Sequence, residues 1–172
     1  MSHKKIINVA LIGNPNTGKT SLFNELTGLN QKVGNYPGVT VYKKEGSSKL
    51  QKNLKAIITD LPGTYSINPT SLDESIVLKT LLNSKSEKKS DVIVVVADID
   101  NLKRNLLLFS QIKDLEIPTV LAINMADQME RKGITLDIKL LEKELGNDVV
   151  LLSVRKEKGI DELKKAIVNT YH

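Results

Sequence analysis

Residues 13–20 of the chain read Gly13-Asn14-Pro15-Asn16-Thr17-Gly18-Lys19-Thr20. They match the pattern G-x-x-x-x-G-K-[ST], which forms a phosphate-binding loop (P-loop) when it joins a strand to a helix. Here an apolar run with β-branched residues precedes the pattern at 6–12, and apolar residues at helical spacing follow it within 18–27. This context argues against an accidental glycine-rich turn, so the sequence predicts a P-loop.

Each part of the loop has an expected task. Gly13 and Gly18 let the backbone curve closely round the phosphates, with its N–H groups pointing inward. The helix that follows presents its positive N-terminal end to the anion. We expect Lys19 to reach the β- and γ-phosphates and the Thr20 hydroxyl to bind Mg²⁺. The residues of this segment predicted to bind the nucleotide are Gly13, Asn14, Asn16, Thr17, Gly18, Lys19, Thr20 and Ser21.

The segment Asn124-Met125-Ala126-Asp127 follows a predicted strand at 118–123, at the sheet edge where open α/β folds bind ligands. It is similar to the N-K-x-D motif of small GTPases, in which the Asp carboxylate accepts the ring N–H and the exocyclic amine of guanine. Adenine lacks this pair of donors, so Asn124 and Asp127 predict a guanine site. Met125 replaces the usual Lys, and its flexible thioether can lie along the base as the alkyl stem of Lys does. The alternative role for Asp127 is a helix cap.

Two further segments are typical of GTPases. Asp60-Leu61-Pro62-Gly63 matches D-x-x-G, in which the Asp holds Mg²⁺ through water and the Gly N–H meets the γ-phosphate. An ordinary Pro-Gly turn is the alternative. Thr40, close to Gly38 in the loop before a predicted hairpin strand, is the expected switch I threonine that binds Mg²⁺ when GTP is present. A threonine that merely begins the strand is the alternative.

Two positions depart from the usual GTPase pattern. Ser153-Val154-Arg155 resembles the S-A-K element, whose backbone touches guanine, but only Ser153 matches outright. Many GTPases place a Gln directly after D-x-x-G to orient the attacking water, and here that residue is Thr64. Because Thr64 is shorter, we expect slow intrinsic hydrolysis unless another group stabilises the transition state. An arginine finger contributes about 10³–10⁵ in rate.

The order of elements predicts one α/β domain with the three-layer P-loop GTPase fold. We expect a six-stranded, mostly parallel sheet with one antiparallel edge strand from a hairpin that turns near 52–53, and helices on both faces. Strands are predicted at 6–12, 40–50, 54–59, 92–97, 118–123 and 149–152. Helices are predicted at 18–27, 73–83, 102–114, 136–145 and 161–169. Loops are expected at 29–38 and 61–72, with a polar connector at 84–90.

Composition excludes several classes of function. The chain has 172 residues, a net charge of +5 and no cysteine, so disulfides, thiolate zinc sites and a Cys nucleophile are excluded. Its lysines are scattered, so we do not expect nucleic acid as a partner. No apolar stretch reaches the length of a transmembrane helix, and the start lacks a signal peptide, so the chain is expected to be soluble. His3 and His172 lie at opposite termini and are not expected to bind metal.

Four segments together carry a family resemblance: GNPN at 13–16, GNYPGVTV at 34–41, DLPGTYS at 60–66 and NMAD at 124–127. Over essentially the whole chain, they resemble the N-terminal G domain of the bacterial ferrous iron transport protein B (FeoB) family. The resemblance implies hydrolysis of GTP to GDP and phosphate that regulates or powers Fe²⁺ uptake. It also implies a helical domain and a membrane domain beyond this chain, a place on the cytoplasmic face of the bacterial inner membrane, and small accessory iron-transport proteins as candidate partners.

The resemblance also implies a role for Asn16. Family members with Asn at this position can bind K⁺ beside the phosphates, where the cation would supply the charge of an arginine finger. The alternative for Asn16 is a turn residue. Tyr36 stands where many relatives have Trp, and Val154 where Ala is usual. The implied catalytic residues are Lys19, Asn16, Thr40 and Gly63. The implied metal-binding residues are Thr20, Thr40 and Asp60 for Mg²⁺, and Asn16 for K⁺. The implied guanine-site residues are Asn124, Met125, Asp127, Ser153 and Val154.

Other functions remain open from the residues alone. A nucleotide switch that binds but hardly hydrolyses GTP would have the same motifs. An RNA- or ribosome-associated GTPase is disfavoured by the scattered lysines. A transport ATPase is disfavoured by Asp127.

Overall fold

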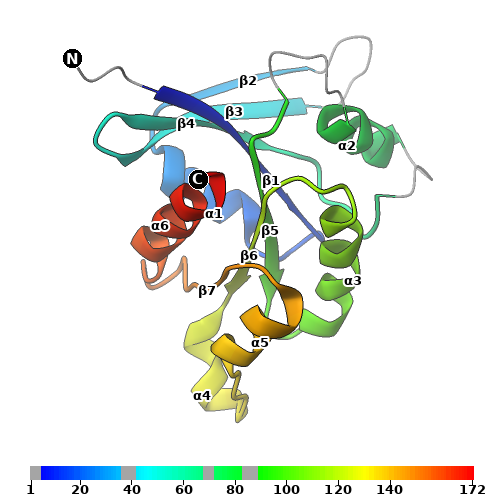
Figure 1. Ribbon diagram of the computed structural model, residues 1–172, viewed down its shortest axis with the longest axis vertical. Helices are drawn as coiled ribbons and strands as arrows, with labels where there is room; N and C mark the ends of the chain where they lie inside the picture. The colour runs from blue at the N-terminus through cyan, green and yellow to red at the C-terminus, as the bar shows by residue number, and fades with distance from the viewer. Residues whose placement is uncertain (1–4, 36–41, 68–71, 83–88) are drawn as a thin grey trace.

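The computed structural model describes residues 5–35, 42–67, 72–82 and 89–172 (Figure 1). Seven strands form one sheet in the order β2-β3-β4-β1-β5-β6-β7. The pairs from β4 through β1, β5 and β6 to β7 are parallel, and β3 is antiparallel to both β2 and β4. The strands are β1 Lys5–Gly13, β2 Gln31–Asn35, β3 Tyr42–Gln51, β4 Leu54–Asp60, β5 Val92–Asp98, β6 Thr119–Asn124 and β7 Val149–Leu151.

Helices cover both faces of this sheet (Figure 1). Those on one side are α1 Lys19–Thr27 and α6 Ile160–Tyr171, whose apolar residues form one core with the facing strand residues. A second core on the other side involves α2 Leu72–Leu82, α3 Leu102–Lys113, α4 Met129–Lys132 and α5 Ile138–Leu145. A single 3-10 turn, η1 Ala126–Gln128, precedes α4. The three-layer α/β prediction is therefore confirmed.

The strand patterns explain the two cores. All seven residues of β5 are buried, as expected for a central parallel strand covered on both faces. In β1, Ile7 and Val9 belong to the core beneath α1 and α6, while Ala10 and Ile12 belong to the opposite core. This alternation follows from the two-residue period of a strand.

The sheet has seven strands rather than the expected six. Gln31–Asn35 lies in the predicted loop at 29–38, but it pairs with β3 from Gln31 opposite Gly46 to Asn35 opposite Tyr42. Since β2 is an edge strand whose Val33 is 59% exposed, its sequence carries no burial pattern. Elsewhere the described element boundaries differ from the predicted ones by one or two residues, apart from η1 and α4, which were not predicted.

The parallel topology gathers the motifs at one edge of the sheet. The carboxyl ends of β1, β4 and β6 carry Gly13, Asp60 and Asn124, and these strands run in the same direction. The hairpin turns where predicted, with Asn53 at φ 68°. Among the described residues, no helix combines the length and the apolar composition that a membrane crossing requires.

The end of α1 packs closely against β3 at Gly46. A Cβ at Gly46 would lie 2.5 Å from Thr27 Cγ2 and 2.9 Å from the Asn30 carbonyl oxygen. We predict that Gly46→Ala lowers the free energy of unfolding by about 1–3 kcal/mol, because α1 must shift to make room. Urea denaturation measures this. Gly34→Ala is the matched control on β2, since a Cβ there meets nothing within 4 Å. Equal stability of the two variants would contradict the packing.

Candidate functional site

The P-loop has the backbone shape that its glycines were expected to provide. A Cβ at Gly13 would lie 2.6 Å from the Val96 carbonyl oxygen, so β5 leaves no room for a side chain there. Gly18 has φ +86°, and a Cβ on it would lie 2.2 Å from Asn124 Nδ2. Between them Asn16 also adopts a left-handed conformation, with φ 70°. The loop is therefore curved tightly against both β5 and Asn124.

A hollow of about 340 Å³ lies in front of this loop, at the N-terminus of α1. Unpaired backbone N–H groups and the helix dipole favour an anion at such a position. Asn14 is 3% exposed, and its amide nitrogen and oxygen both lack a hydrogen-bond partner among the described residues. Since buried unpaired amides are costly, this residue also suits a polar ligand. The hollow is lined by Asn14, Pro15, Asn16, Gly18, Lys19, Thr20, Ser21 and Gly63.

Lys19 and Asp60 meet directly in this structure. The Lys19 ammonium forms an ion pair with the Asp60 carboxylate and donates to the Leu61 carbonyl oxygen at 2.5 Å. Lys19 is 9% exposed and Asp60 8%, so each buried charge has its partner in the other. The sequence had predicted separate roles, phosphate for Lys19 and Mg²⁺ for Asp60. The structure shows that the two side chains are paired with each other.

The side-chain amide of Asn124 connects the P-loop to the loop after β7. Its nitrogen donates to the Thr17 carbonyl oxygen at 3.1 Å, and its oxygen accepts from the Val154 backbone N–H at 3.1 Å. Asn124 is only 5% exposed. The sequence assigned this residue to the base site, and the structure shows that it also fixes the phosphate loop.

Asp127 lies beside Ser153, as the two predicted guanine elements require. The Ser153 hydroxyl donates to Asp127 Oδ1 at 2.8 Å. This hydrogen bond is the main cause that lowers the pKa of Asp127 below its ordinary value of 3.8, helped by the positive charges of Arg155 and Lys156. Asp127 lies inside η1, and the N-cap residue of η1 is Met125. Asp127 therefore does not cap this helix, as the alternative had proposed. The exposed carboxylate is held in its charged form.

The D-x-x-G segment runs from the end of β4 to the P-loop. A Cβ on Gly63 would lie 3.2 Å from Pro15, so the two loops are in close contact. Thr64 is 2% exposed; its N–H donates to the Gly13 carbonyl oxygen at 2.9 Å, and its hydroxyl donates to the Ser66 carbonyl oxygen at 2.7 Å. The Thr64 side chain is thus turned into its own loop, where it fixes backbone shape.

Sequence reasoning missed the contribution of α3 to this segment. Gln111 Oε1 accepts from the Ser66 hydroxyl at 3.0 Å and from the Ile67 N–H at 2.9 Å. The Arg104 guanidinium lies 4.7 Å from the centre of the Tyr65 ring. Arg104 and Gln111 are seven residues apart and so share one helix face, which is the one sequence pattern that links them. Nothing in the sequence indicates which loop that face meets.

Part of the predicted site falls outside the described residues, namely Gly38 and Thr40, as does Tyr36. In the described ranges, no group of three or more His, Asp and Glu residues could hold a metal ion. The remaining predicted residues gather at the carboxyl edge of the sheet, around the hollow or around Asn124.

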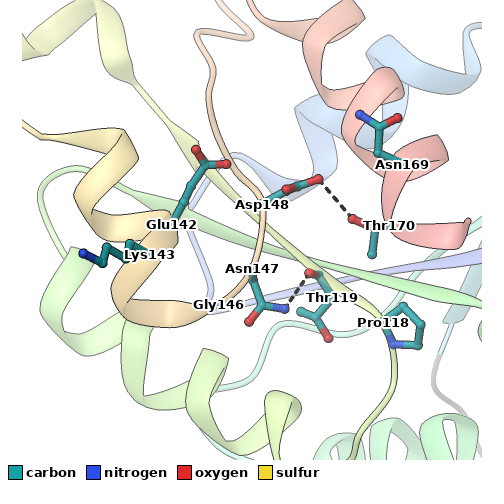
Figure 2. Close-up of a pocket in the computed structure, with 9 residues that line it drawn as sticks. All are labelled: Pro118, Thr119, Glu142, Lys143, Gly146, Asn147, Asp148, Asn169 and Thr170. Carbon is teal, nitrogen blue, oxygen red and sulfur yellow. Dashed lines mark hydrogen bonds between the residues drawn. The ribbon is translucent and has the colours of Figure 1, made fainter.

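A larger hollow, of about 680 Å³, lies at the opposite edge of the sheet (Figure 2). It is lined by residues at the amino ends of β6 and β7 and the end of α6. Figure 2 shows the Asn147 amide donating to the Thr119 carbonyl oxygen and the Thr170 hydroxyl donating to the Asp148 carboxylate, at 3.0 and 3.3 Å. It is lined by none of the predicted site residues and has no glycine-rich loop, so we assign the functional site to the smaller hollow.

Similar proteins agree with this geometry. A family model described as ferrous iron transport protein B matches residues 7–167. The chain is 48% identical over 157 residues to the Fe(2+) transporter FeoB of Leptospira biflexa serovar Patoc, covering 91% of this chain and 22% of that protein. The chain thus spans about a fifth of the length of such curated relatives.

Two solved structures have the same fold. The cytosolic domain of the T. maritima FeoB iron transporter in its apo form matches with a TM-score of 0.91 and 41% identity, covering 98% of this chain and 65% of that one. A mutant of S. thermophilus NFeoB bound to GDP matches with a TM-score of 0.87 and 44% identity, covering 95% and 62%. The chain therefore belongs to the ferrous iron transport protein B family and has the P-loop GTPase fold of that family's G domains.

Proposed function

We propose that this chain binds GTP and GDP and hydrolyses GTP to GDP and phosphate, as the nucleotide-dependent part of a ferrous iron transporter. One observation carries the proposal: Asn124 joins an anion-binding loop to the segment Ser153–Val154, and the Ser153 hydroxyl donates to the Asp127 carboxylate, a group suited to guanine. A solved relative bound to GDP supports it. In this role the nucleotide state regulates or powers Fe²⁺ uptake.

Phosphate binding uses an exchange of partners. Lys19 leaves the Asp60 carboxylate for the β- and γ-phosphate oxygens, so its charge stays compensated. Asp60 and the Thr20 hydroxyl would then hold Mg²⁺, with Thr40 when GTP is bound. Oxygen donors are the ligands this ion prefers, and Thr20 lines the hollow. When bound, Mg²⁺ offsets the negative charge of the phosphate oxygens. Backbone N–H groups of the P-loop, within 13–21 but excluding Pro15, complete the phosphate-binding loop.

Guanine recognition depends on Asp127. Its carboxylate accepts the ring N–H and the exocyclic amine, and Ser153 keeps it oriented and charged. Met125, half-buried in this structure, lies along the base. The backbone of Ser153 and Val154 borders the other side, since Asn124 holds it in place.

Hydrolysis would proceed by positioning and charge stabilisation. In this proposal the Gly63 N–H meets the γ-phosphate, and Gly38 and Thr40, which lie outside the described residues, contribute to nucleotide binding. The Thr64 hydroxyl is engaged with Ser66 and does not replace a Gln, so intrinsic turnover is slow. Asn16 lines the hollow with an exposed amide whose oxygen suits K⁺, and a K⁺ ion there would supply the charge of an arginine finger.

The proposal also includes the place of the chain in the cell. The T. maritima relative is a cytosolic domain of an iron transporter. We accordingly place this chain on the cytoplasmic face of the bacterial inner membrane, connected to helical and membrane domains of its own protein. Small accessory iron-transport proteins are candidate partners, and nucleic acid is not.

A second candidate function is a switch that binds GTP without hydrolysing it at a useful rate. The engaged Thr64 hydroxyl favours it, because Thr64 stands at the position of the usual Gln and its hydroxyl donates to the Ser66 carbonyl oxygen instead of to a water. Single-turnover measurements separate the two. Conversion of bound GTP within minutes supports the enzyme, and a complex that persists for hours supports the switch.

Asp127→Asn should exchange guanine for xanthine. An amide offers one acceptor and one donor, which pair with the ring N–H and the 2-oxo group of xanthine, whereas guanine presents two donors. We predict at least about a hundredfold loss of GDP affinity together with a gain for xanthosine diphosphate. Titration calorimetry with both nucleotides measures this. Ser153→Ala is the control, expected to weaken GDP binding without reversing the preference. An unchanged preference in Asp127→Asn would refute the guanine assignment.

The pKa of Asp127 is testable by carbon NMR titration of its carboxyl group. We predict a value below 3.8, and a rise toward 3.8 in Ser153→Ala, because the Ser153 hydroxyl is the main cause of the lowering. Since a lowered pKa stabilises the folded state only while the group is charged, this contribution is present above pH 3.8 and vanishes as the pH falls through the folded-state pKa. Arg155→Gln should raise the pKa less than Ser153→Ala. If the pKa of Asp127 in the unmodified chain is equal to or higher than in Ser153→Ala, the hydrogen bond from Ser153 does not lower it, and the geometry is contradicted.

The K⁺ role of Asn16 can be measured by GTP turnover in KCl and NaCl at equal ionic strength. We predict at least about tenfold faster turnover in KCl, because the cation stabilises developing negative charge. Asn16→Gly should abolish this gain, since glycine keeps the left-handed backbone and removes only the amide. Its GDP affinity should stay within about twofold of the unmodified chain. Identical rates in both salts would count against the role.

A further inference from the structure

We propose that Gln111 of α3 is a positioning residue for γ-phosphate recognition, although it does not touch the nucleotide. Through Gln111, α3 holds residues 64–67 in place, and Gly63 is thereby kept against the phosphate hollow. The inference rests on the proposed function, in which the Gly63 N–H contacts the γ-phosphate. This phosphate is present in GTP and absent from GDP.

Gln111 holds this segment with a single atom. Its Oε1 accepts from the Ser66 hydroxyl at 3.0 Å and from the Ile67 backbone N–H at 2.9 Å. The helix behind it is firmly anchored, because Leu108, Phe109 and Ile112 are almost fully buried in the core on this side of the sheet. Gln111 is therefore a fixed acceptor presented by a rigid element to two donors of a loop.

The other side of the same segment is tied to the P-loop. The Thr64 N–H donates to the Gly13 carbonyl oxygen, and the Thr64 hydroxyl donates to the Ser66 carbonyl oxygen. Ser66 thus connects the anchor on the P-loop with the anchor on α3. Gly63 immediately precedes Thr64, about 3.8 Å away between Cα atoms, and it lines the hollow. A shift of the segment 64–67 would therefore move Gly63 relative to the hollow.

Gln111 fixes the position of this segment more precisely than Arg104, another α3 residue that contacts it. Arg104 lies over the ring of Tyr65, but both residues are exposed, and Tyr65 is 46% exposed. Cation–π contacts at exposed sites are weak and are not sharply directional. The two hydrogen bonds to Gln111 are half-buried and directional, so they define where the backbone lies.

The test compares two substitutions of similar shape. Gln111→Met keeps the length of the side chain but replaces a strong acceptor by a poor one. Gln111→Glu keeps an oxygen that accepts both hydrogen bonds. Titration calorimetry in excess Mg²⁺ gives the affinities for GDP and for a non-hydrolysable GTP analogue. Hydrogen exchange at the Ile67 amide reports the segment itself.

We expect Gln111→Met to bind the GTP analogue about five- to tenfold more weakly, with GDP affinity nearly unchanged, because only the γ-phosphate contact is lost. Its Ile67 amide should exchange faster. Gln111→Glu should match the unmodified chain in both readouts. Ser110→Ala, on the exposed neighbouring position of α3, should also leave both unchanged.

The outcomes separate this inference from the proposed function. If the unmodified chain binds neither nucleotide, the proposed function fails and the inference with it. If it binds both and Gln111→Met weakens GDP and the GTP analogue equally, or neither, only the inference is overturned. Should Gln111→Met fail to fold, Ser66→Ala removes one of the two donors and should shift the same ratio by a smaller factor; an unchanged ratio there would also overturn the inference.

Discussion

The side-chain amide of Asn124 is the contact on which the site depends. With one donor and one acceptor it binds the carbonyl of Thr17 in the P-loop and the N–H of Val154 after β7. A Cβ on Gly18 would collide with the same amide, so the P-loop is shaped around it. The P-loop follows β1 in the middle of the sheet and the loop with Val154 follows β7 at its edge, so this buried amide fixes the spacing of the two loops. In the proposed function these two loops recognise the phosphates and the base.

Charge balance explains how the charge of Lys19 can be buried at the P-loop. A buried ammonium would be costly alone, and Asp60 compensates it while Leu61 accepts a further hydrogen bond. In the proposed nucleotide complex, phosphate oxygens replace Asp60 as the partner of Lys19, and a divalent cation replaces Lys19 as the partner of Asp60. Under that proposal, ligand binding redistributes existing pairs. This arrangement also connects the phosphate hollow to the segment after β4, whose further course depends on α3.

Most of the fold and the identity of the motifs could be predicted from local patterns, because the P-loop, NMAD and DLPG each follow a strand. What could not be predicted depends on contacts between distant residues. β2 is stabilised by pairing with β3 and not by its own apolar pattern, so Gln31–Asn35 looked like a loop. The Lys19–Asp60 pair spans 41 positions and the Asn124–Thr17 bond 107. Gln111 is an ordinary polar helix residue until the loop that it meets is known.

The proposed function depends most on guanine binding by a site whose loops Asn124 holds together. The most direct measurement is a calorimetric titration of the unmodified chain with GDP and with ADP, each in the presence of Mg²⁺. We predict saturable one-to-one binding of GDP and binding of ADP that is weaker by at least about a hundredfold, because the Asp127 carboxylate is proposed to accept two donors that only guanine presents. Equal affinity for the two nucleotides, or no binding of GDP, would contradict it.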